Sequence, residues 1–199
     1  MSTLAFALAA TIKHDGQGGI ADLLATPAQA TAWLDQHEHL VAEVLGRPFE
    51  GAADVRDELI RVRRAVRALF ARAVAPEPPS KADADRLMDA AAALRMVNRA
   101  ADRLGTTQLD WPDDGPPVTQ WVGRTDDPSA LLVGAIGRSA IDFLAGPDRS
   151  RLRACPAARC VKYFLQDDPR QLWCSPSCGN RERVNRHYRR RHGTVGGRD

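Results

Sequence analysis

The four cysteines of this chain all lie between residues 155 and 178, and the rest of the 199-residue sequence contains none. They form two close pairs, Cys155-x4-Cys160 and Cys174-x3-Cys178, with thirteen residues between the pairs. Two such pairs can supply four thiolates to a tetrahedral Zn²⁺ ion while the insert folds back as a hairpin. The alternative is two disulfides, which persist in oxidising compartments. The spacing predicts one structural zinc ion held by Cys155, Cys160, Cys174 and Cys178.

The net charge of +3 is unevenly distributed along the chain. Residues 1–150 contain 16 Lys and Arg against 21 Asp and Glu, whereas residues 151–199 contain 12 against 4. The thiolates of a four-cysteine zinc centre offset only a small part of the positive excess in the second segment. A mildly acidic body joined to a compact basic segment is typical of a protein whose basic end meets a polyanion.

The apolar start of the chain, Leu4–Ile12, is too short to span a membrane and has no basic residues before it. We therefore expect a buried strand or a short helix here, and a cytoplasmic protein without a membrane partner.

The pattern of residues 1–146 predicts a mostly helical domain. Thr26, Pro27 and Gln29 have the identities of an N-cap, a first helical residue and a capping box, and Gly46 suits the end of that helix. A second helix is expected from residue 54 to about 75, where apolar residues recur every three or four positions and several arginines fall on the solvated side.

A proline-rich break at residues 76–79 precedes Ser80, which is expected to cap a third helix reaching Leu104. Its apolar stripe would consist of Leu87, Ala91, Leu94, Val97, Ala101 and Leu104. Alternating residues at 108–111 and 118–122 predict a β-hairpin around a Pro-, Asp- and Gly-containing turn. A fourth helix should begin at Asp127-Pro128 and end at Gly146-Pro147.

Residues 151–192 are expected to form a separate small finger, followed by a flexible tail at residues 193–199. The knuckle at residues 155–160 would lead into a hairpin of residues 161–165 and 171–173, and Ser175 would cap a helix with Cys178 in its first turn. Its apolar contacts would come from Tyr163, Phe164, Leu172, Trp173, Val184 and Tyr188. The predicted fold is a mainly α N-terminal domain with a β-hairpin, plus a small treble-clef-like zinc finger.

Projection of the last helix at 100° per residue separates its side chains into two groups. Val184, Tyr188 and Arg181 fall on the side of Cys178, whereas Arg183, Arg186 and Arg190 gather on the far side, with Arg189 at an edge. We predict nucleic-acid contacts by Arg183, Arg186, Arg189 and Arg190. A merely solvated basic face is the alternative.

The run Cys178-Gly179-Asn180-Arg181 resembles the CGNR zinc-finger family, and Cys155, Cys160, Phe164 and the basic helix agree with it. The resemblance implies DNA binding by the finger and an N-terminal ABATE domain that senses a signal or oligomerises. Thr26-Pro27 followed by Trp33-Leu34 is similar to the start of that domain's first helix. The family usually opens with an apolar strand that carries Asp and an Asn-Thr pair, of which residues 5–11 keep only the apolar character and the Thr. Trp173, Asn180, Arg181 and Tyr188 are expected to support the finger.

The leading hypothesis is a bacterial-type transcription regulator that binds DNA through its zinc finger, with a homodimer or a small-molecule effector as further partners of the N-terminal domain. A zinc-stabilised protein-interaction module is the second hypothesis. RNA binding is the third, with Tyr163 or Tyr188 stacking on bases if exposed. We expect no enzyme, because the sequence has no nucleophile–base pattern or phosphate loop, and four thiolates leave zinc no open coordination position.

Overall fold

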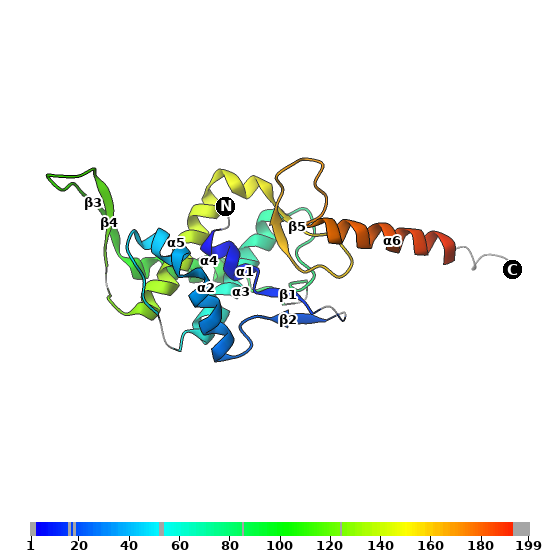
Figure 1. The fold of residues 1–199 in the computed structure, drawn as a ribbon, viewed down its shortest axis with the longest axis horizontal. Coiled ribbons are helices and arrows are strands. Elements are labelled where there is room, and N and C mark those ends of the chain that lie inside the picture. Colours follow the sequence, from blue (N-terminus) through cyan, green and yellow to red (C-terminus); the bar gives the residue numbers. More distant parts are fainter. Residues whose placement is uncertain are drawn as a thin grey trace.

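The computed structural model describes residues 3–15, 17, 19–51, 54–84, 86–123 and 125–192 (Figure 1). The predicted flexible tail, residues 193–199, lies outside the described residues. The α-helices are α1 (Leu4–Ala9), α2 (Pro27–Leu45), α3 (Arg56–Val74), α4 (Ala90–Ala101), α5 (Pro128–Ala145) and α6 (Pro176–His192). Short 3₁₀ helices follow α4 and α5 as η1 (Asp102–Leu104) and η2 (Pro147–Arg151).

The strands are short and form antiparallel hairpins rather than one sheet. They are β1 (Ile12–His14), β2 (Ile20–Asp22), β3 (Thr106–Asp110), β4 (Val118–Val122), β5 (Leu152–Ala154) and β6 (Tyr163–Leu165). In the described part of the chain, β1 pairs with β2, β3 with β4 and β5 with β6. The N-terminal domain is therefore mainly helical, as predicted.

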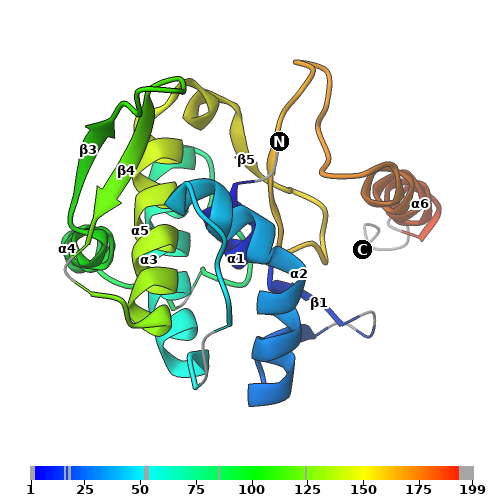
Figure 2. The ribbon, with the colours of Figure 1, turned by 60° about the vertical axis from the view of Figure 1, so that its left-hand side comes forward.

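Helix α5 is the central element of the N-terminal domain and contacts α1, α2, α3 and α4 (Figure 2). A Cβ atom at Gly137 would lie 2.5 Å from the Ala101 nitrogen, so the glycine lets α5 approach α4 closely. By length and composition alone α5 could also cross a membrane, but 56% of it is buried inside the protein. Its apolar character therefore belongs to a core helix.

The first two helices begin as their sequences indicate. The N-terminal apolar segment forms the short helix α1, one of the two predicted alternatives, and the Phe6 amide donates to the Thr3 hydroxyl at 3.3 Å. At α2, Thr26 and Gln29 form the complete capping box, and Gly46 ends the helix with a left-handed φ of 68°. Local capping signals thus place this element correctly.

The prediction of the third helix is wrong for its first part, before residue 90. Residues 81–84 form turns, and α4 begins only at Ala90, where the Asp89 carboxylate accepts from the Ala92 amide at 2.9 Å. Ser80 is buried and its hydroxyl donates to the Val161 carbonyl at 2.8 Å, so a contact with the finger replaces the predicted cap. The buried face of α4 also differs from the predicted stripe. Leu87 and Leu94 of the predicted stripe are exposed, whereas Ala93, Val97 and Ala100 are buried.

The β3–β4 hairpin confirms the predicted change from helix to strand. Gln108 pairs with Gln120 at the middle of its register. The hairpin extends from the end of the molecule opposite α6 (Figure 1), and the Trp121 indole N–H near its base donates to the Val44 carbonyl at 3.0 Å. The distal side chains of Leu109 and Trp111 are about 70% and 68% exposed.

The finger contains a hairpin, but the predicted strand pairing is wrong. Strand β6 pairs with β5, with Leu152 opposite Leu165 and Ala154 opposite Tyr163, and residues 171–173 form no strand. The segment before the first cysteine therefore supplies the partner strand, and the cysteine knuckle forms the turn between the two strands. Helix α6 then leaves the body as a single projecting helix (Figures 1 and 2).

Candidate metal centre and basic helix

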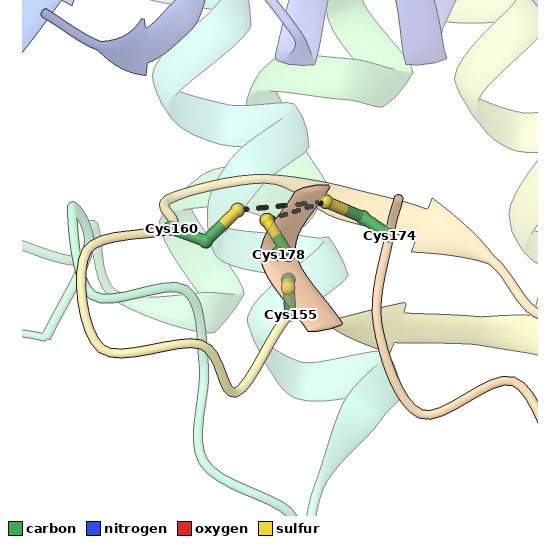
Figure 3. Close-up of side chains that lie close together, drawn as sticks. All are labelled: Cys155, Cys160, Cys174 and Cys178. Carbon is green, nitrogen blue, oxygen red and sulfur yellow. Dashed lines mark hydrogen bonds between the residues drawn. The ribbon is translucent and has the colours of Figure 1, made fainter. Parts of the chain in front are cut away.

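The four cysteine sulfurs converge at the junction of the β5–β6 hairpin and α6 (Figure 3). The Sγ atom of Cys174 lies 3.6 Å from the Sγ atoms of both Cys160 and Cys178, and all four Sγ atoms lie within 4.8 Å of one another. Zn–S bonds of about 2.3 Å place the sulfurs of a tetrahedral site about 3.8 Å apart. Three of the cysteines are buried and Cys174 is half-buried, so the geometry fits a closed structural zinc site.

Local hydrogen bonds explain how the two cysteine pairs are held. In the knuckle, the Cys155 amide donates to the Lys162 carbonyl and the Cys160 amide to the Ala157 carbonyl, each at 2.9 Å. At the second pair, the Ser175 hydroxyl accepts from the Cys178 amide at 3.4 Å at the start of α6. The helix N-terminus favours a thiolate at Cys178 through its dipole.

The four thiols cannot all ionise without a cation at this distance. Hydrogen bonds from the thiols of Cys160 and Cys174 lower the pKa of Cys155 to about 2. The hydrogen bond to Cys155 raises the pKa of Cys160 to about 11, and hydrogen bonds to Cys155 and Cys160 raise the pKa of Cys174. A metal that binds four thiolates must displace the remaining protons, so its affinity falls as the pH falls.

A tryptophan packs against the start of α6 because a glycine is there. A Cβ atom at Gly179 would lie 2.9 Å from Cδ1 of Trp173, closer than side chains normally approach. Trp173 is half-buried and packs on the cluster formed by Cys155, Ala157, Cys160, Phe164 and Cys178. Trp173 therefore packs against the metal centre, which accounts for the glycine next to Cys178, and its role in supporting the finger stays a prediction.

Glu182 makes a second link between α6 and the knuckle that the sequence did not indicate. Its Oε1 accepts from the Ala158 amide at 2.7 Å, across a separation of 24 residues. The single acidic residue within the described part of α6 therefore holds the helix against the turn that carries Cys155 and Cys160. The one sequence signal that could have identified this contact is the presence of an acidic residue in an otherwise basic helix.

A buried polar network joins the finger to the N-terminal domain, and it was also missed from the sequence. Arg67 of α3 donates to the Asp83 carboxylate at 2.8 Å and to the Val161 carbonyl at 3.3 Å. The Tyr163 hydroxyl donates to Asp83 at 2.9 Å and accepts from the Ser80 amide at 3.3 Å. Burial, followed by the charge of Asp83, raises the pKa of Tyr163. Burial of Tyr163 also removes it as a base-stacking residue.

The connecting segment between α3 and α4, which carries Ser80 and Asp83, also brings a lysine to the cysteine knuckle. The Lys81 ammonium donates to the carbonyls of Pro156 and Ala157 at 3.0 and 2.6 Å. The backbone between Cys155 and Cys160 is therefore held by the N-terminal domain as well as by the finger.

The four arginines predicted to contact nucleic acid are all exposed on α6. Arg186, Arg189 and Arg190 line a shallow depression of about 400 Å³ together with Glu182. The Arg183 guanidinium donates to the Asn180 side chain at 2.8 Å. Three of these guanidinium groups thus lie close together on a helix that projects from the body (Figure 1).

Three apolar side chains predicted to pack inside the finger are exposed instead. Leu172 is 63% exposed, Val184 68% and Tyr188 64%. The exposure of Tyr188 rules out a fully buried packing position, and its role in supporting the finger stays a prediction. Asn180 is exposed, with its side chain accepting from Arg183, and Arg181 is half-buried. A structural role of Arg181 stays a prediction.

A mainly helical domain joined to a small four-cysteine metal site with a basic helix defines the class of protein: a zinc-finger protein with a helical N-terminal domain. The model of the ABATE family, described as "Putative stress-induced transcription regulator", matches residues 2–147, and that of the CGNR zinc finger matches residues 151–191. The chain belongs to the ABATE family and carries a CGNR zinc finger. A search of curated proteins found no match.

The family and the geometry together assign the cofactor. The four clustered cysteines of a CGNR zinc finger hold one structural zinc ion. When bound, this ion cross-links the knuckle to the first turn of α6, which a segment of this size cannot achieve by burying apolar surface alone.

Proposed function

We propose that this protein is a cytoplasmic transcription regulator that binds DNA through α6. The observation that carries the proposal is the placement of Arg183, Arg186, Arg189 and Arg190 on a solvent-exposed helix whose base is fixed by the metal centre. The regulator description of the matched N-terminal family supports the same function. The helical domain would supply regulation or dimerisation.

The arginines would act first on the phosphate backbone. Guanidinium groups bind phosphate oxygens as charge-assisted, bidentate donors, and such contacts fix the position of a helix on the duplex. The zinc centre would hold the helix in place, because Glu182 and Trp173 tie its first two turns to the knuckle. A single finger offers few base contacts, so we expect two copies to cooperate on one site.

Selection from a random duplex library tests the proposal. Wild-type protein should enrich a defined sequence, and the Arg183→Ala, Arg186→Ala, Arg190→Ala variant should enrich none. A matched control removes three exposed arginines of the helical domain, Arg47→Ala, Arg64→Ala and Arg86→Ala, and should behave as wild type. Absence of enrichment by wild type would contradict DNA readout, and enrichment from an RNA library instead would assign the helix to RNA.

A second candidate function is a protein-interaction module, and one observation favours it. The β3–β4 hairpin extends from the body with Leu109 and Trp111 about 70% and 68% exposed at its far end. Exposed aromatic and aliphatic groups of this kind typically become buried at protein interfaces. Capture of a partner that is lost in a Leu109→Ser, Trp111→Ser variant, without any enrichment of DNA, would favour this function.

We propose a structural rather than a catalytic role for the metal. Four thiolate ligands fill the tetrahedral shell of zinc, which leaves no position for a bound water or substrate.

A further inference from the structure

A groove lies between α3 and α4, on the helical domain. It encloses about 430 Å³, which is within the range of small-molecule sites. Its floor includes Val62 of α3, Met96 of α4 and Val133 of α5, of which Val62 and Val133 are buried. The groove therefore offers an apolar surface at the bottom of a concave site.

The rim of the groove is strongly basic. Arg61, Arg95, Arg99 and Arg103 line it, and Glu58 is its single carboxylate. Glu58 is already occupied, because both of its oxygens accept from the Arg103 guanidinium, at 2.9 and 3.2 Å. Three guanidinium charges thus remain without a carboxylate in the groove.

Two of these arginines have free guanidinium groups. Within the described part of the chain, neither Arg95 nor Arg99 has a hydrogen-bond or ion-pair partner for its side chain, and both are exposed. They lie one helical turn apart on α4, so their Cα atoms are separated by about 6 Å along one face. Like charges at this spacing repel each other, and a bound anion would remove that cost.

We propose that this groove binds a small organic phosphate. Arg95 and Arg99 would donate to the phosphate oxygens in the bidentate geometry that guanidinium groups favour, and Arg61 would add positive charge from α3. The apolar part of the ligand would cover Met96 and Val62. Binding here does not require α6 to contact DNA, so the site can be tested separately from the proposed function.

Calorimetric titration of the full zinc-loaded chain with hexyl phosphate tests this inference, with inorganic phosphate and 1-hexanol as partial probes. Hexyl phosphate should bind once per chain and at least tenfold more tightly than inorganic phosphate, because it fills both the basic rim and the apolar floor. Hexanol should give no measurable heat. Binding of hexyl phosphate no tighter than that of inorganic phosphate would overturn the proposal.

Matched variants locate the binding. Arg95→Gln with Arg99→Gln should lower the affinity for hexyl phosphate at least tenfold, whereas Arg64→Gln with Arg86→Gln, an equal change in charge outside the groove, should leave it within twofold. Equal loss in both variants would show a nonspecific charge effect and overturn the site. An α6 variant, Arg183→Gln, Arg186→Gln, Arg190→Gln, should retain binding, and its loss there would place the phosphate on α6 instead.

Discussion

At the scale of single residues, the metal centre depends on a few side chains with no direct contact to the metal. Gly179 leaves the space that the Trp173 indole occupies, and Glu182 accepts a hydrogen bond from the Ala158 amide. The cysteines themselves were identified from their spacing, because ligand chemistry fixes both the residue type and its separation. Glu182 was missed because its partner is a backbone amide 24 residues away.

Gly179→Ala should weaken the finger. The new methyl group would lie 2.9 Å from the Trp173 ring, and overpacking of this kind costs about 1–3 kcal/mol. We expect zinc affinity to fall by roughly tenfold for each 1.4 kcal/mol lost, measured by competition with a chromophoric chelator. Val184→Ala, a change at a residue of the same helix that is 68% exposed, is the control. Equal zinc affinity of both variants would disprove the steric role of Gly179.

At the scale of elements, capping signals predicted the helix starts correctly where the capping residue binds an amide in the same turn of the chain. Helix α2 starts with its predicted capping box, and α5 starts at its predicted Asp127 cap. The predicted helix begins about ten residues before α4 because Ser80 has the identity of an N-cap. In the structure the Ser80 hydroxyl donates to the Val161 carbonyl instead. The partner of β6 was misassigned for a similar reason, since strand pairing depends on tertiary contacts that a short segment does not encode.

One element-scale ion pair should make stability depend on pH. Asp22 of β2 is bound by the Arg63 guanidinium of α3 at 2.6 Å through its Oδ2. Burial opposes ionisation of Asp22, but hydrogen bonds from Arg63 and the Leu24 amide, with the charges of Arg63 and Arg56, lower its pKa below 3.8. A carboxyl group with a lowered pKa stabilises the fold above the pKa of the unfolded chain, and this contribution is lost as the pH falls through the folded pKa.

We therefore expect wild type to lose more unfolding free energy than Asp22→Asn between pH 5 and about pH 3, as measured by urea denaturation at each pH. Asp57→Asn serves as a control, because that carboxylate is largely exposed beside Arg56 and should change the slope little. Parallel pH profiles of wild type and Asp22→Asn would contradict the role of this ion pair.

At the scale of the whole molecule, the finger and the helical domain form one connected structure. Arg67 and Ser80 bind the Val161 carbonyl directly after Cys160, and Tyr163 binds Asp83 in the connecting segment. The sequence separates two domains at residues 146–150 but does not indicate these contacts, since Arg67 belongs to an arginine-rich helix that was expected to be partly solvated. Loss of zinc from the metal centre should therefore lower the stability of the helical domain.

Tyr163→Phe tests this coupling. The change removes the hydrogen bond to the buried Asp83 carboxylate and the one that the hydroxyl accepts from the Ser80 amide, and it should cost about 1–3 kcal/mol. In wild type, removing zinc with a chelator should lower the thermal midpoint of the helical domain, followed by far-UV circular dichroism. The same treatment should shift the midpoint less in Tyr163→Phe. An unchanged wild-type midpoint after complete zinc removal would show that the two parts unfold independently.

The shape of the molecule also bears on how it would meet DNA. Helix α6 and the β3–β4 hairpin extend from opposite ends (Figure 1), so a duplex on α6 would leave the hairpin free for a second protein chain. In the proposed complex, the α6 arginines neutralise phosphate charge while zinc holds the helix in place. Such contacts release condensed counterions, which makes affinity depend on salt in a predictable way.

The most direct test is the salt dependence of affinity for a selected duplex, measured by fluorescence anisotropy. Four phosphate contacts by one α6 predict a log–log slope of about −3.6 for each bound copy, and a single remaining contact predicts about −0.9 for each copy. Wild type should show the first slope and the Arg183→Ala, Arg186→Ala, Arg190→Ala variant the second, with the Arg47→Ala, Arg64→Ala, Arg86→Ala control matching wild type. Equal slopes for wild type and the α6 variant would contradict a role of this helix in DNA binding.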